Sequence, residues 1–559
     1  MNVDCARAGQ RPNTLAGSTW LAPGCIFVGS CLLYLINLDR SPWPDELYHV
    51  LAARGLLEHG EPRIAEGLYD RVFAYTWLVS RMFALLGESL ATARLPSLLA
   101  MAALNTWLFV WLRKETDARV AWIAAGLFAV SPFALETAQF ARFYALQSLS
   151  FFGGGIAIYE AVKRLQPVDH RTIAYALIGL ACFGFAIYLQ PTTFLGIAGV
   201  GLWLGTVIAV PWLAAPDVAH NRKLFAVGLG LVGCAAILGV SLATGLAAEF
   251  WHRYRWTPPW NEASVNEFWY YHVFYVLFYP SLWPVIGLLS LAALARWPRV
   301  AWFAMVIFAV GFLLNSFAGP KSPRYLVYAQ PFLFMLFGLG LAALLPWLAR
   351  AIGAFNRRIE ANLAAVGLAG WRLPEIMLGG ALLVVVIANA ALIRTATLLA
   401  DVTVPPQLPP IQWQATRPIV EPLLSEAEVV VTMAELETLY FWERYDVLFS
   451  PSRLTEMAEQ HEFAADHRTG RPVISTRDSL AQLVDCTASG LFIAPDRRWR
   501  QPQLIDAEAT AFIERDLRRL DLPVSSELLV FHWKHRPPAE DTATCAALRE
   551  LLPKREAGS

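Results

Sequence analysis

The sequence predicts an all-α transmembrane bundle of about eleven helices, followed by a smaller α/β domain outside the membrane. Hydrophobic residues make up 56% of the chain and charged residues only 16%, whereas soluble proteins carry about 25% charged residues. Apolar runs of membrane-spanning length recur as far as residue 395, and a polar, Pro-rich stretch follows. Lipid is therefore expected to be the solvent for much of the chain.

The membrane domain is predicted to occupy residues 19–395. Apolar runs of about 17 to 25 residues can cross the hydrocarbon layer as helices. Such runs begin near residues 19, 92, 119, 142, 172, 192, 223, 270, 300, 325 and 374. No small-residue cleavage site follows the first run, so we interpret it as a retained helix and not as a signal peptide.

Short basic loops predict the orientation of the bundle. Arg113-Lys114, Lys163-Arg164 and Arg222-Lys223 all fall on the same side. The positive-inside rule makes that side cytoplasmic and places the N-terminal tail, residues 1–18, there as well. An odd number of spans then puts the C-terminal domain on the extracytoplasmic side. We expect a multi-pass protein of the cell inner (plasma) membrane.

The first outside loop, residues 38–91, contains two segments that favour helices. Residues 46–59 can form an amphipathic helix. Residues 72–86 are apolar apart from Arg81, and this segment is short for a membrane span. It suits a helix that lies along the membrane interface.

A Pro-rich linker, residues 396–412, leads into the predicted α/β domain, residues 413–559. Short β-like runs alternate with helical ones there. The β-like runs are Val429–Val431, Val447–Phe449, Leu491–Ala494 and Leu528–Phe531, and a helix is expected at residues 507–520. The domain has no G-x-G-x-x-G or P-loop that would bind a nucleotide. In an oxidising compartment Cys486 and Cys545 can pair, with two unpaired thiols as the alternative.

Composition argues against several classes of function. The net charge is zero, so nothing indicates a nucleic-acid partner. The seven cysteines are scattered, without the spacing of a zinc site. The sequence gives no support for a Ser/His/Asp triad. Asp45 and His49 stand four residues apart and can share a divalent metal, although two ligands alone are a weak metal signal.

Acidic residues in the outside loops are the first candidates for chemistry. Asp45 and Glu46 follow a Pro-Trp-Pro turn just beyond the first span. Asp45 can cap the helix that follows, and a capping carboxylate can still face a cavity. Glu136 lies in the second outside loop. It is either an ordinary loop acid, for instance paired with Arg142, or a carboxylate that lines a functional cavity.

Cationic and aromatic residues on the same side are the second set of candidates. Positive charge is unusual on the extracytoplasmic side. Snorkelling to lipid headgroups explains it structurally, and a clamp on a phosphate group explains it functionally. The residues concerned are Arg142 with Tyr144, Lys321 with Arg324 and Tyr325, and Arg253 with Arg255.

Three short motifs carry a resemblance to a known family. They are Pro44-Asp45-Glu46 with Tyr48, then Ala141-Arg142-Phe143-Tyr144-Ala145-Leu146, and finally Lys321 and Arg324-Tyr325 followed by Pro331. Their order and the layout of spans resemble the C-type membrane glycosyltransferases. The similarity is to the branch that contains protein O-mannosyltransferases and lipid A aminoarabinose transferases, and it covers roughly residues 20–395. The C-terminal domain lies outside it.

The resemblance implies roles for individual residues. Asp45 would be the catalytic base and Glu136 an assisting acid, at a position where many relatives carry Asp. Arg142, Lys321 and Arg324 would contact the donor phosphate. Where relatives often carry His near the start of the sixth span, this chain has Gln190. Some relatives use a divalent metal and others do not. Further substrate-binding candidates are Glu46, Tyr48, Tyr144, Arg253, Arg255 and Tyr325.

The sequence therefore predicts an inverting glycosyltransferase with an extracytoplasmic active site. It would move a sugar from a polyprenyl-phosphate carrier to a lipid, a protein or a cell-envelope glycan, in contact with membrane lipids. A transporter or flippase of a lipid-linked substrate is the main alternative, although no inverted repeat of interrupted helices is visible. A non-catalytic scaffold that binds partners through the α/β domain is a third reading.

Overall fold

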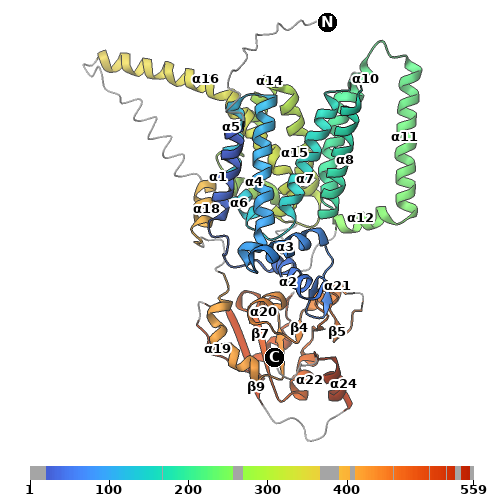
Figure 1. Cartoon of the computed structure of the whole chain (residues 1–559), viewed down its shortest axis with the longest axis vertical. Coiled ribbons are helices and arrows are strands. Elements are labelled where there is room, and N and C mark those ends of the chain that lie inside the picture. The colour runs from blue at the N-terminus through green and yellow to red at the C-terminus, as the bar shows by residue number, and fades with distance from the viewer. Residues whose placement is uncertain are drawn as a thin grey trace.

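The computed structural model has three layers, stacked along the longest axis of the molecule (Figure 1). It describes residues 20–165, 168–255, 268–365, 390–402, 410–457, 459–502, 504–523, 526–534 and 543–553. A helical bundle forms one end, the α/β domain forms the other, and α2 (Pro44–His59) and α3 (Phe73–Leu86) lie between them.

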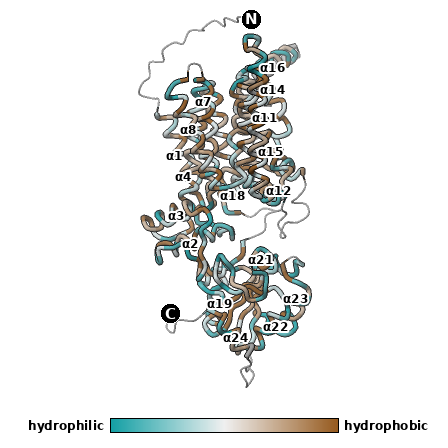
Figure 2. The backbone as a smooth tube through the Cα atoms, turned by 90° about the vertical axis from the view of Figure 1, so that its right-hand side faces the viewer, coloured by the Kyte–Doolittle hydropathy of each residue, from teal (hydrophilic) through white to brown (hydrophobic). Residues whose placement is uncertain are grey.

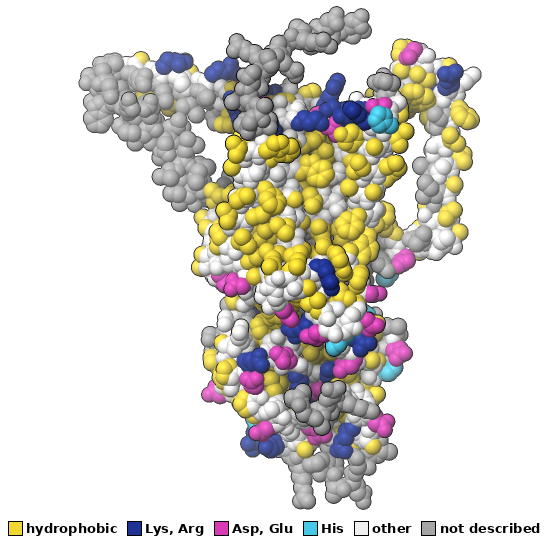
Figure 3. Space-filling model, viewed as in Figure 1, with side chains coloured by type: hydrophobic (Ala, Val, Ile, Leu, Met, Phe, Trp, Pro, Cys, Tyr) yellow, Lys and Arg dark blue, Asp and Glu magenta, His cyan; other side chains and the backbone are white. Residues whose placement is uncertain are grey.

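The bundle is a multi-pass membrane unit. Five of its described helical segments are long and apolar enough to cross a membrane, or six if the bent pair α5–α6 counts as one span. Apolar side chains cover a broad band on the face of the bundle that Figure 3 shows, and many of its residues are coloured as hydrophobic in Figure 2. Its helices are α1 (Leu21–Leu35), α4 (Leu90–Glu115), α5 (Ala118–Ala129), α6 (Pro132–Ala138), α7 (Tyr144–Val162), α8 (His170–Leu189), α9 (Thr193–Leu204), the π-helix η1 (Gly205–Ala209), α10 (Val210–Ala214), α11 (His220–Ala243), α12 (Leu246–Arg255), α13 (Tyr270–Phe278), α14 (Ile286–Arg296), α15 (Pro298–Phe317), the 3-10 helix η3 (Pro323–Ala329), α16 (Gln330–Ala365) and α18 (Ala390–Leu399).

One of the predicted spans differs in the structure. The apolar run that begins near residue 270 was expected to be one helix, but it is divided into the short helices α13 and α14. Pro280 and Pro284 lie in the break, where proline lacks the N–H that a continuous helix needs. The run that begins near residue 374 falls outside the described residues, so the total of about eleven spans stays a prediction.

The first outside loop is folded, with both expected helices present as α2 and α3. Pro44 starts α2 with its fixed φ, and the Glu46 side chain accepts the Trp43 N–H, which closes the first turn. Gly60 ends α2 in the left-handed region at φ 77°, where glycine has no Cβ penalty. A two-stranded hairpin, β1 (Arg63–Ile64) and β2 (Gly67–Leu68), separates α2 from α3.

The C-terminal domain contains a seven-stranded sheet in the order β5-β6-β4-β3-β7-β9-β8. Its four central strands are parallel, while β5, β9 and β8 pair antiparallel at the edges. The four expected strands are present as β3 (Val429–Thr432), β4 (Val447–Phe449), β7 (Ser489–Pro495) and β9 (Leu528–Lys534), and the others are β5 (Ala464–Ala465), β6 (Pro472–Ile474) and β8 (Arg518–Arg519). The helices are α19 (Trp413–Glu426), α20 (Glu435–Trp442), α21 (Pro451–Glu456), α22 (Arg477–Cys486), the 3-10 helix η4 (Asp496–Arg498), α23 (Ala507–Asp516) and α24 (Ala543–Leu551).

The two faces of this sheet belong to different cores, because successive strand residues point to opposite sides. Val429 and Val431 face a core that α22, α23 and α24 cover. Val430 and Leu448 face a second core, which also contains Leu47 and Leu51 of α2. The sheet and the first outside loop therefore share one hydrophobic core.

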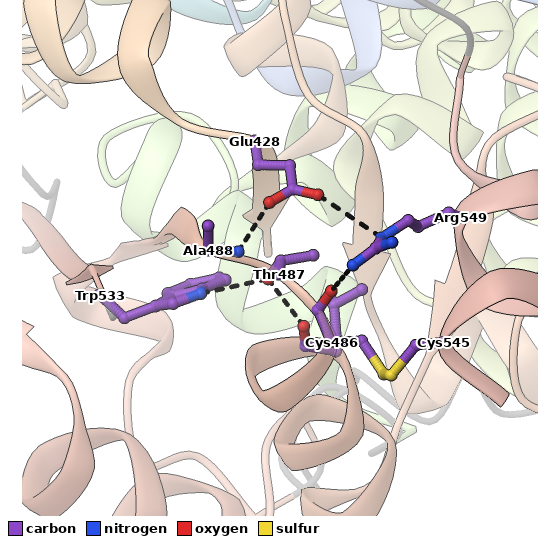
Figure 4. The surroundings of a disulfide bond; sticks show 8 residues. Glu428, Cys486, Thr487, Ala488, Trp533, Cys545 and Arg549 are labelled. Atoms are coloured by element: carbon purple, nitrogen blue, oxygen red, sulfur yellow. Dashed lines mark hydrogen bonds and ion pairs between the residues drawn. A yellow bond between two sulfur atoms is a disulfide. The ribbon is translucent and has the colours of Figure 1, made fainter. Parts of the chain in front are cut away.

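A disulfide joins Cys486 at the end of α22 to Cys545 of α24, and the structure thus contains the pairing that the sequence left open. Figure 4 shows its surroundings. The Arg549 guanidinium donates to the Cys486 carbonyl at 3.1 Å and faces the Glu428 carboxylate at 3.8 Å. The Trp533 indole N–H donates to Thr487 Oγ1 at 3.2 Å. The disulfide and the Arg549 contacts hold α24 against α22 and the residue before β3.

Candidate functional site

Asp45 lies where three elements meet, at the end of the bundle that faces the α/β domain (Figure 1). It occupies the first turn of α2, and its carboxylate is ion-paired with Arg324 of η3. Arg142, from the turn between α6 and α7, donates from Nη1 to the Asp45 carbonyl at 2.9 Å. About a third of the Asp45 side chain stays exposed (37%), so a ligand can reach it.

The two arginines are held by neighbouring aromatic residues and hydroxyls. Arg142 Nη1 also donates to the Tyr69 hydroxyl at 3.2 Å, and the Ser97 hydroxyl donates to the Arg142 carbonyl at 3.0 Å. The Arg324 guanidinium lies 5.9 Å from the ring centroids of both Phe140 and Tyr144. Cations above aromatic rings gain roughly 0.5–1 kcal/mol where they are exposed and more where they are desolvated.

Positive charge outweighs negative charge around Asp45. Burial alone would raise the pKa of this carboxyl group, but the charges of Arg324 and Arg142, with Arg71 behind them, lower it to about 2. One carboxylate thus faces three guanidinium groups. Such an excess of positive charge favours the arrival of an anion.

Two N–H donors at this site have no acceptor among the described residues. They are Nε of Arg142 and Nε of Arg324, both buried. An unpaired buried donor costs roughly 1–3 kcal/mol. Guanidinium N–H groups match phosphate and carboxylate oxygens in a planar, paired geometry. The site therefore has the donors for an anionic ligand, and an acidic oxygen beside them.

Glu46, the neighbour of Asp45, is fully committed to structure. Its carboxylate accepts from Arg94 Nε and Nη2, both at 2.8 Å, with both side chains completely buried. The same carboxylate accepts the N–H groups of Trp43 at 2.9 Å and Ala141 at 2.8 Å. These bonds occupy both oxygens, so Glu46 joins the first and second predicted outside loops. The substrate contact that the sequence suggested for Glu46 would require it to give up these partners.

The fold of this chain is similar to that of known membrane proteins. No family model and no curated protein sequence matches the chain. Crystal structures of ArnT from Cupriavidus metallidurans do match it, in the apo state with a TM-score of 0.56 and bound to undecaprenyl phosphate with 0.57, each at 16% identity. The alignments cover 93% and 92% of this chain and 98% of ArnT. The chain has the fold of the C-type membrane glycosyltransferases, the GT-C fold. The archaeal oligosaccharyltransferase AglB from Archaeoglobus fulgidus matches at a TM-score of 0.49 and 13% identity, over 86% of this chain and 70% of its own.

Within the GT-C bundle, Glu136 lies on α6 and forms a 3.3 Å ion pair with Arg394 of α18. Arg394 covers the Phe278 ring at 4.1 Å, and Thr395 of α18 donates to the Val130 carbonyl at 2.8 Å. These contacts fasten α18 to α6. No recorded contact between described residues joins Glu136 to Asp45 or to Arg142.

Lys321 points toward the end of a helix. Its buried ammonium donates to the carbonyl groups of Asn315, Ser316 and Ala318, at the C-terminal end of α15. Burial lowers the pKa of Lys321 to about 8. Cations at this end of a helix complement its dipole. A role as a phosphate ligand would require Lys321 to leave these acceptors.

His49 is completely buried. Its Nδ1 lies 2.8 Å from the Thr76 hydroxyl, and the ring makes edge contacts with Tyr69, Tyr75 and Phe143. Burial and the nearby Arg142 charge lower its pKa well below the usual value. No group of three or more His, Cys, Asp or Glu that could hold a metal occurs among the described residues. Asp45 and His49 therefore have no third ligand of these types in the described part of the chain, and metal binding by the two stays a prediction.

The other aromatic and basic candidates divide into two groups. Tyr144 and Tyr325 lie beside Arg324 and interact electrostatically with it. Arg255 is at the end of α12, with its guanidinium 5.7 Å from the centroid of the Trp251 ring, and this is its contact within the described part of the chain. Arg253 lies in the same helix, and its side chain is not among those that the structure describes.

Sequence reasoning missed Arg94, Tyr69 and Arg71. A signal for Arg94 was available, since a charged residue inside an apolar helix needs a buried partner. Tyr69 and Arg71 stand in a polar part of the first outside loop and gave no such signal. Their place beside Asp45 depends on the turn between the hairpin and α3.

Proposed function

We propose that this chain is an inverting glycosyltransferase that uses a polyprenyl-monophosphate sugar as donor and Asp45 as the base. The observation that carries the proposal is the group of three arginines around one accessible carboxylate, two of them with unpaired N–H donors. The GT-C fold supports it, and so does the undecaprenyl phosphate bound to the structurally similar ArnT.

In the proposed reaction the acceptor hydroxyl oxygen attacks the anomeric carbon from the face opposite the phosphate. The bond between the anomeric carbon and the phosphate oxygen breaks, and its electron pair leaves with the phosphate. The acceptor proton passes to Asp45, and the products are the glycosylated acceptor and the polyprenyl phosphate. Arg324 and Arg142 stabilise the second negative charge that develops on the departing phosphate.

Asp45 needs the donor to become a useful base. A carboxylate with a pKa of about 2 holds a proton poorly, and general bases work best with a pKa closer to the working pH. A donor phosphate that accepts from Arg324 would draw that guanidinium away from Asp45. The pKa of Asp45 would then rise, since the Arg324 charge, which stabilises its ionised form most, would be shared with the phosphate.

The roles of the other residues follow from their contacts. Arg142 and Arg324 are assigned to the donor phosphate, with Tyr144 and Tyr325 shaping the surface beside Arg324. Assistance by Glu136 and phosphate binding by Lys321 stay predictions, since each has a complete structural role in the present geometry. We assign no metal. The acceptor is a lipid, a protein or a cell-envelope glycan, and the active site is expected on the extracytoplasmic side.

Transfer from a radiolabelled undecaprenyl-phosphate sugar in membranes tests this function. Wild type is expected to move label to an acceptor, and Asp45→Asn to lose this activity by roughly 10²–10⁴-fold, the usual contribution of a general base. Asp70→Asn is the matched control, because Asp70 is an exposed aspartate of the same loop and should keep normal transfer. Equal transfer by wild type and Asp45→Asn would remove Asp45 from the mechanism.

A flippase is the competing function, and the same membranes distinguish it. Label that crosses the bilayer still attached to its carrier, with no acceptor labelled across a panel of sugars, would favour transport over transfer. Arg142 and Arg324 would then bind the carrier phosphate without any bond being broken.

A further inference from the structure

Besides the shared hydrophobic core, the hydroxyl of Tyr48 joins the C-terminal α/β domain to the helix that carries Asp45 by hydrogen bonds. Tyr48 stands one helical turn after Asp45 in α2 and is 8% exposed. Its hydroxyl accepts from Arg453 Nη2 at 2.8 Å and from Arg468 Nη1 at 2.9 Å, both residues of the α/β domain. The Arg468 guanidinium also lies 5.4 Å from the Tyr48 ring centroid.

The two arginines are themselves fixed by acids of the same domain. Arg453 pairs with Glu435 at 2.7 Å and with the fully buried Asp466 at 3.5 Å, and Arg468 pairs with Glu456 at 3.2 Å. Partly buried charge networks of this kind hold a defined geometry, because each lost partner leaves a desolvated charge unpaired. Tyr48 is thus the point where a rigid network of the domain contacts α2.

Contacts continue from Tyr48 to the proposed base. The Tyr48 ring stacks on Tyr69, with centroids 5.0 Å apart and planes 12° apart. The Tyr69 hydroxyl accepts from Arg142, and the same Arg142 Nη1 donates to the Asp45 carbonyl at 2.9 Å. A displacement of Tyr48 would therefore reach Asp45 by two routes, along the first turns of α2 and through Tyr69 and Arg142.

A second contact beside Tyr48 keeps the domain from turning on it. The hairpin β1–β2 meets the loop that follows β5: the Glu66 N–H donates to the Thr469 carbonyl at 3.1 Å, and the Glu66 carboxylate pairs with Arg471. The backbones approach so closely that a Cβ on Gly67 would stand 2.5 Å from backbone atoms of Arg468 and Thr469. Gly470, at φ 72°, faces Glu66 from the other side.

We propose that the α/β domain is a positioning element of the active site, and that Tyr48, Arg453 and Arg468 are the residues through which it sets the orientation of Asp45. Tyr48 was a substrate-binding candidate from the sequence. Here its hydroxyl is occupied by the domain, and its role is to hold α2. The proposal rests on Asp45 being the base, and deepens the proposed function without extending it to a new ligand.

Tyr48→Phe tests it, since the change keeps the ring stack and removes only the hydroxyl that accepts from both arginines. We expect kcat to fall about tenfold with the KM for an undecaprenyl-phosphate sugar nearly unchanged, because small misplacements of a reacting group reduce rate strongly. Arg453→Met should act in the same direction. Arg453→Lys should restore part of kcat, as the charge returns without the planar fork. Arg515→Met, at an exposed arginine of α23, is the control and should keep wild-type kcat.

Hydrogen–deuterium exchange of α2 gives a readout that does not depend on turnover. Tyr48→Phe is expected to speed exchange of the α2 amides and leave α4 unchanged. Suppose that the α2 amides of Tyr48→Phe exchange faster but that no protein, wild type included, transfers sugar. The domain would then still position α2, and the proposed function would be rejected. Normal kcat and normal exchange in Tyr48→Phe would overturn the positioning role and leave the proposed function standing.

A cross-link covers the case in which Tyr48→Phe fails to fold. A Glu66→Cys, Thr469→Cys double variant should oxidise readily, because the two backbones are already hydrogen-bonded. The oxidised protein is expected to keep at least half of the transfer rate of its reduced form. Loss of transfer on oxidation, recovered on reduction, would show that the domain has to move away, which contradicts a fixed positioning role.

Discussion

Two acid–arginine pairs, Asp45 with Arg324 and Glu136 with Arg394, look alike and differ in their surroundings. All four side chains are between 28% and 37% exposed. Asp45 is one carboxylate facing three guanidinium groups. Near Glu136 the charges are more mixed, because the neighbouring Arg40 interacts with Arg94 as well as with the acids Glu136, Glu46 and Asp401.

This difference in charge balance separates a binding site from a structural pair. The pair of Glu136 with Arg394 carries no net charge, although Arg394 Nε has no acceptor among the described residues and the guanidinium lies over the ring of Phe278. The Asp45 site keeps an excess of positive charge that a phosphate would neutralise. The two pairs are therefore alike as ion pairs and differ in the net charge of their surroundings.

Removing the arginine of each pair should give the largest contrast. Arg324→Met is expected to reduce transfer by roughly 10³-fold, as found when a preorganised donor to a developing charge is removed. Arg394→Met should cost less than about tenfold, since its loss loosens α18 and leaves the phosphate site intact. Initial transfer rates at matched protein levels measure both, and equal losses would remove the distinction between the two pairs.

Replacing the Arg142 guanidinium with a lysine ammonium group should have a smaller effect, on binding of the carrier. Arg142→Lys keeps the charge but cannot donate to Tyr69, to the Asp45 carbonyl and to a phosphate at once, so binding of undecaprenyl phosphate should weaken by about ten- to a hundredfold. Arg394→Lys is the matched control. Equilibrium binding of the labelled carrier in detergent gives the ratio, and unchanged binding in Arg142→Lys would exclude Arg142 from the phosphate site.

The pH dependence of kcat/KM tests the pairing of Asp45 with Arg324. Asp45 is ionised above its lowered pKa of about 2, so wild-type kcat/KM should have no acid limb from Asp45 between roughly pH 5 and 8. In Arg324→Met the largest opposing charge is gone and burial raises the pKa, so an acid limb should enter the measurable range and rate should fall as pH falls. An unshifted profile in Arg324→Met would argue against the pairing.

Loss of the disulfide should have the smallest effect on transfer. The Cys486–Cys545 bond lies on the sheet face that α22 and α24 cover, away from the core shared with α2. Cys486→Ser with Cys545→Ser should lower the melting temperature of the α/β domain, since disulfides are worth about 2–4 kcal/mol. Transfer below that temperature should stay within twofold. A larger loss would indicate that both faces of the sheet affect Asp45.

The sequence predicted elements whose pattern is local and repeated. Apolar periodicity located most spans, and the β-rich runs gave β3, β4, β7 and β9 at nearly their observed places. The break between α13 and α14 was missed, although Pro280 and Pro284 signalled it. Asp45, Arg142 and Arg324 were found as separate residues because charge is conspicuous beside apolar helices.

The contacts between distant segments could not be predicted in this way. Adjacent residues Asp45 and Glu46 look equivalent in sequence, and only packing decides that Glu46 meets Arg94 inside the protein while Asp45 meets Arg324 at its surface. Likewise Tyr48 is 405 residues from Arg453 in the chain, and no pattern in either segment indicates that they touch. Such pairings depend on the tertiary arrangement of the two domains.

Single-turnover transfer by Asp45→Asn and Glu136→Gln, side by side in the same membranes, tests the central claim most directly. Both changes remove one negative charge and keep the size of the side chain. With a saturating undecaprenyl-phosphate sugar, Asp45→Asn should lose roughly 10³-fold in rate and Glu136→Gln less than about tenfold. A Glu136→Gln protein that is as inactive as Asp45→Asn, or an Asp45→Asn protein with wild-type rate, would contradict the assignment of Asp45 as the base.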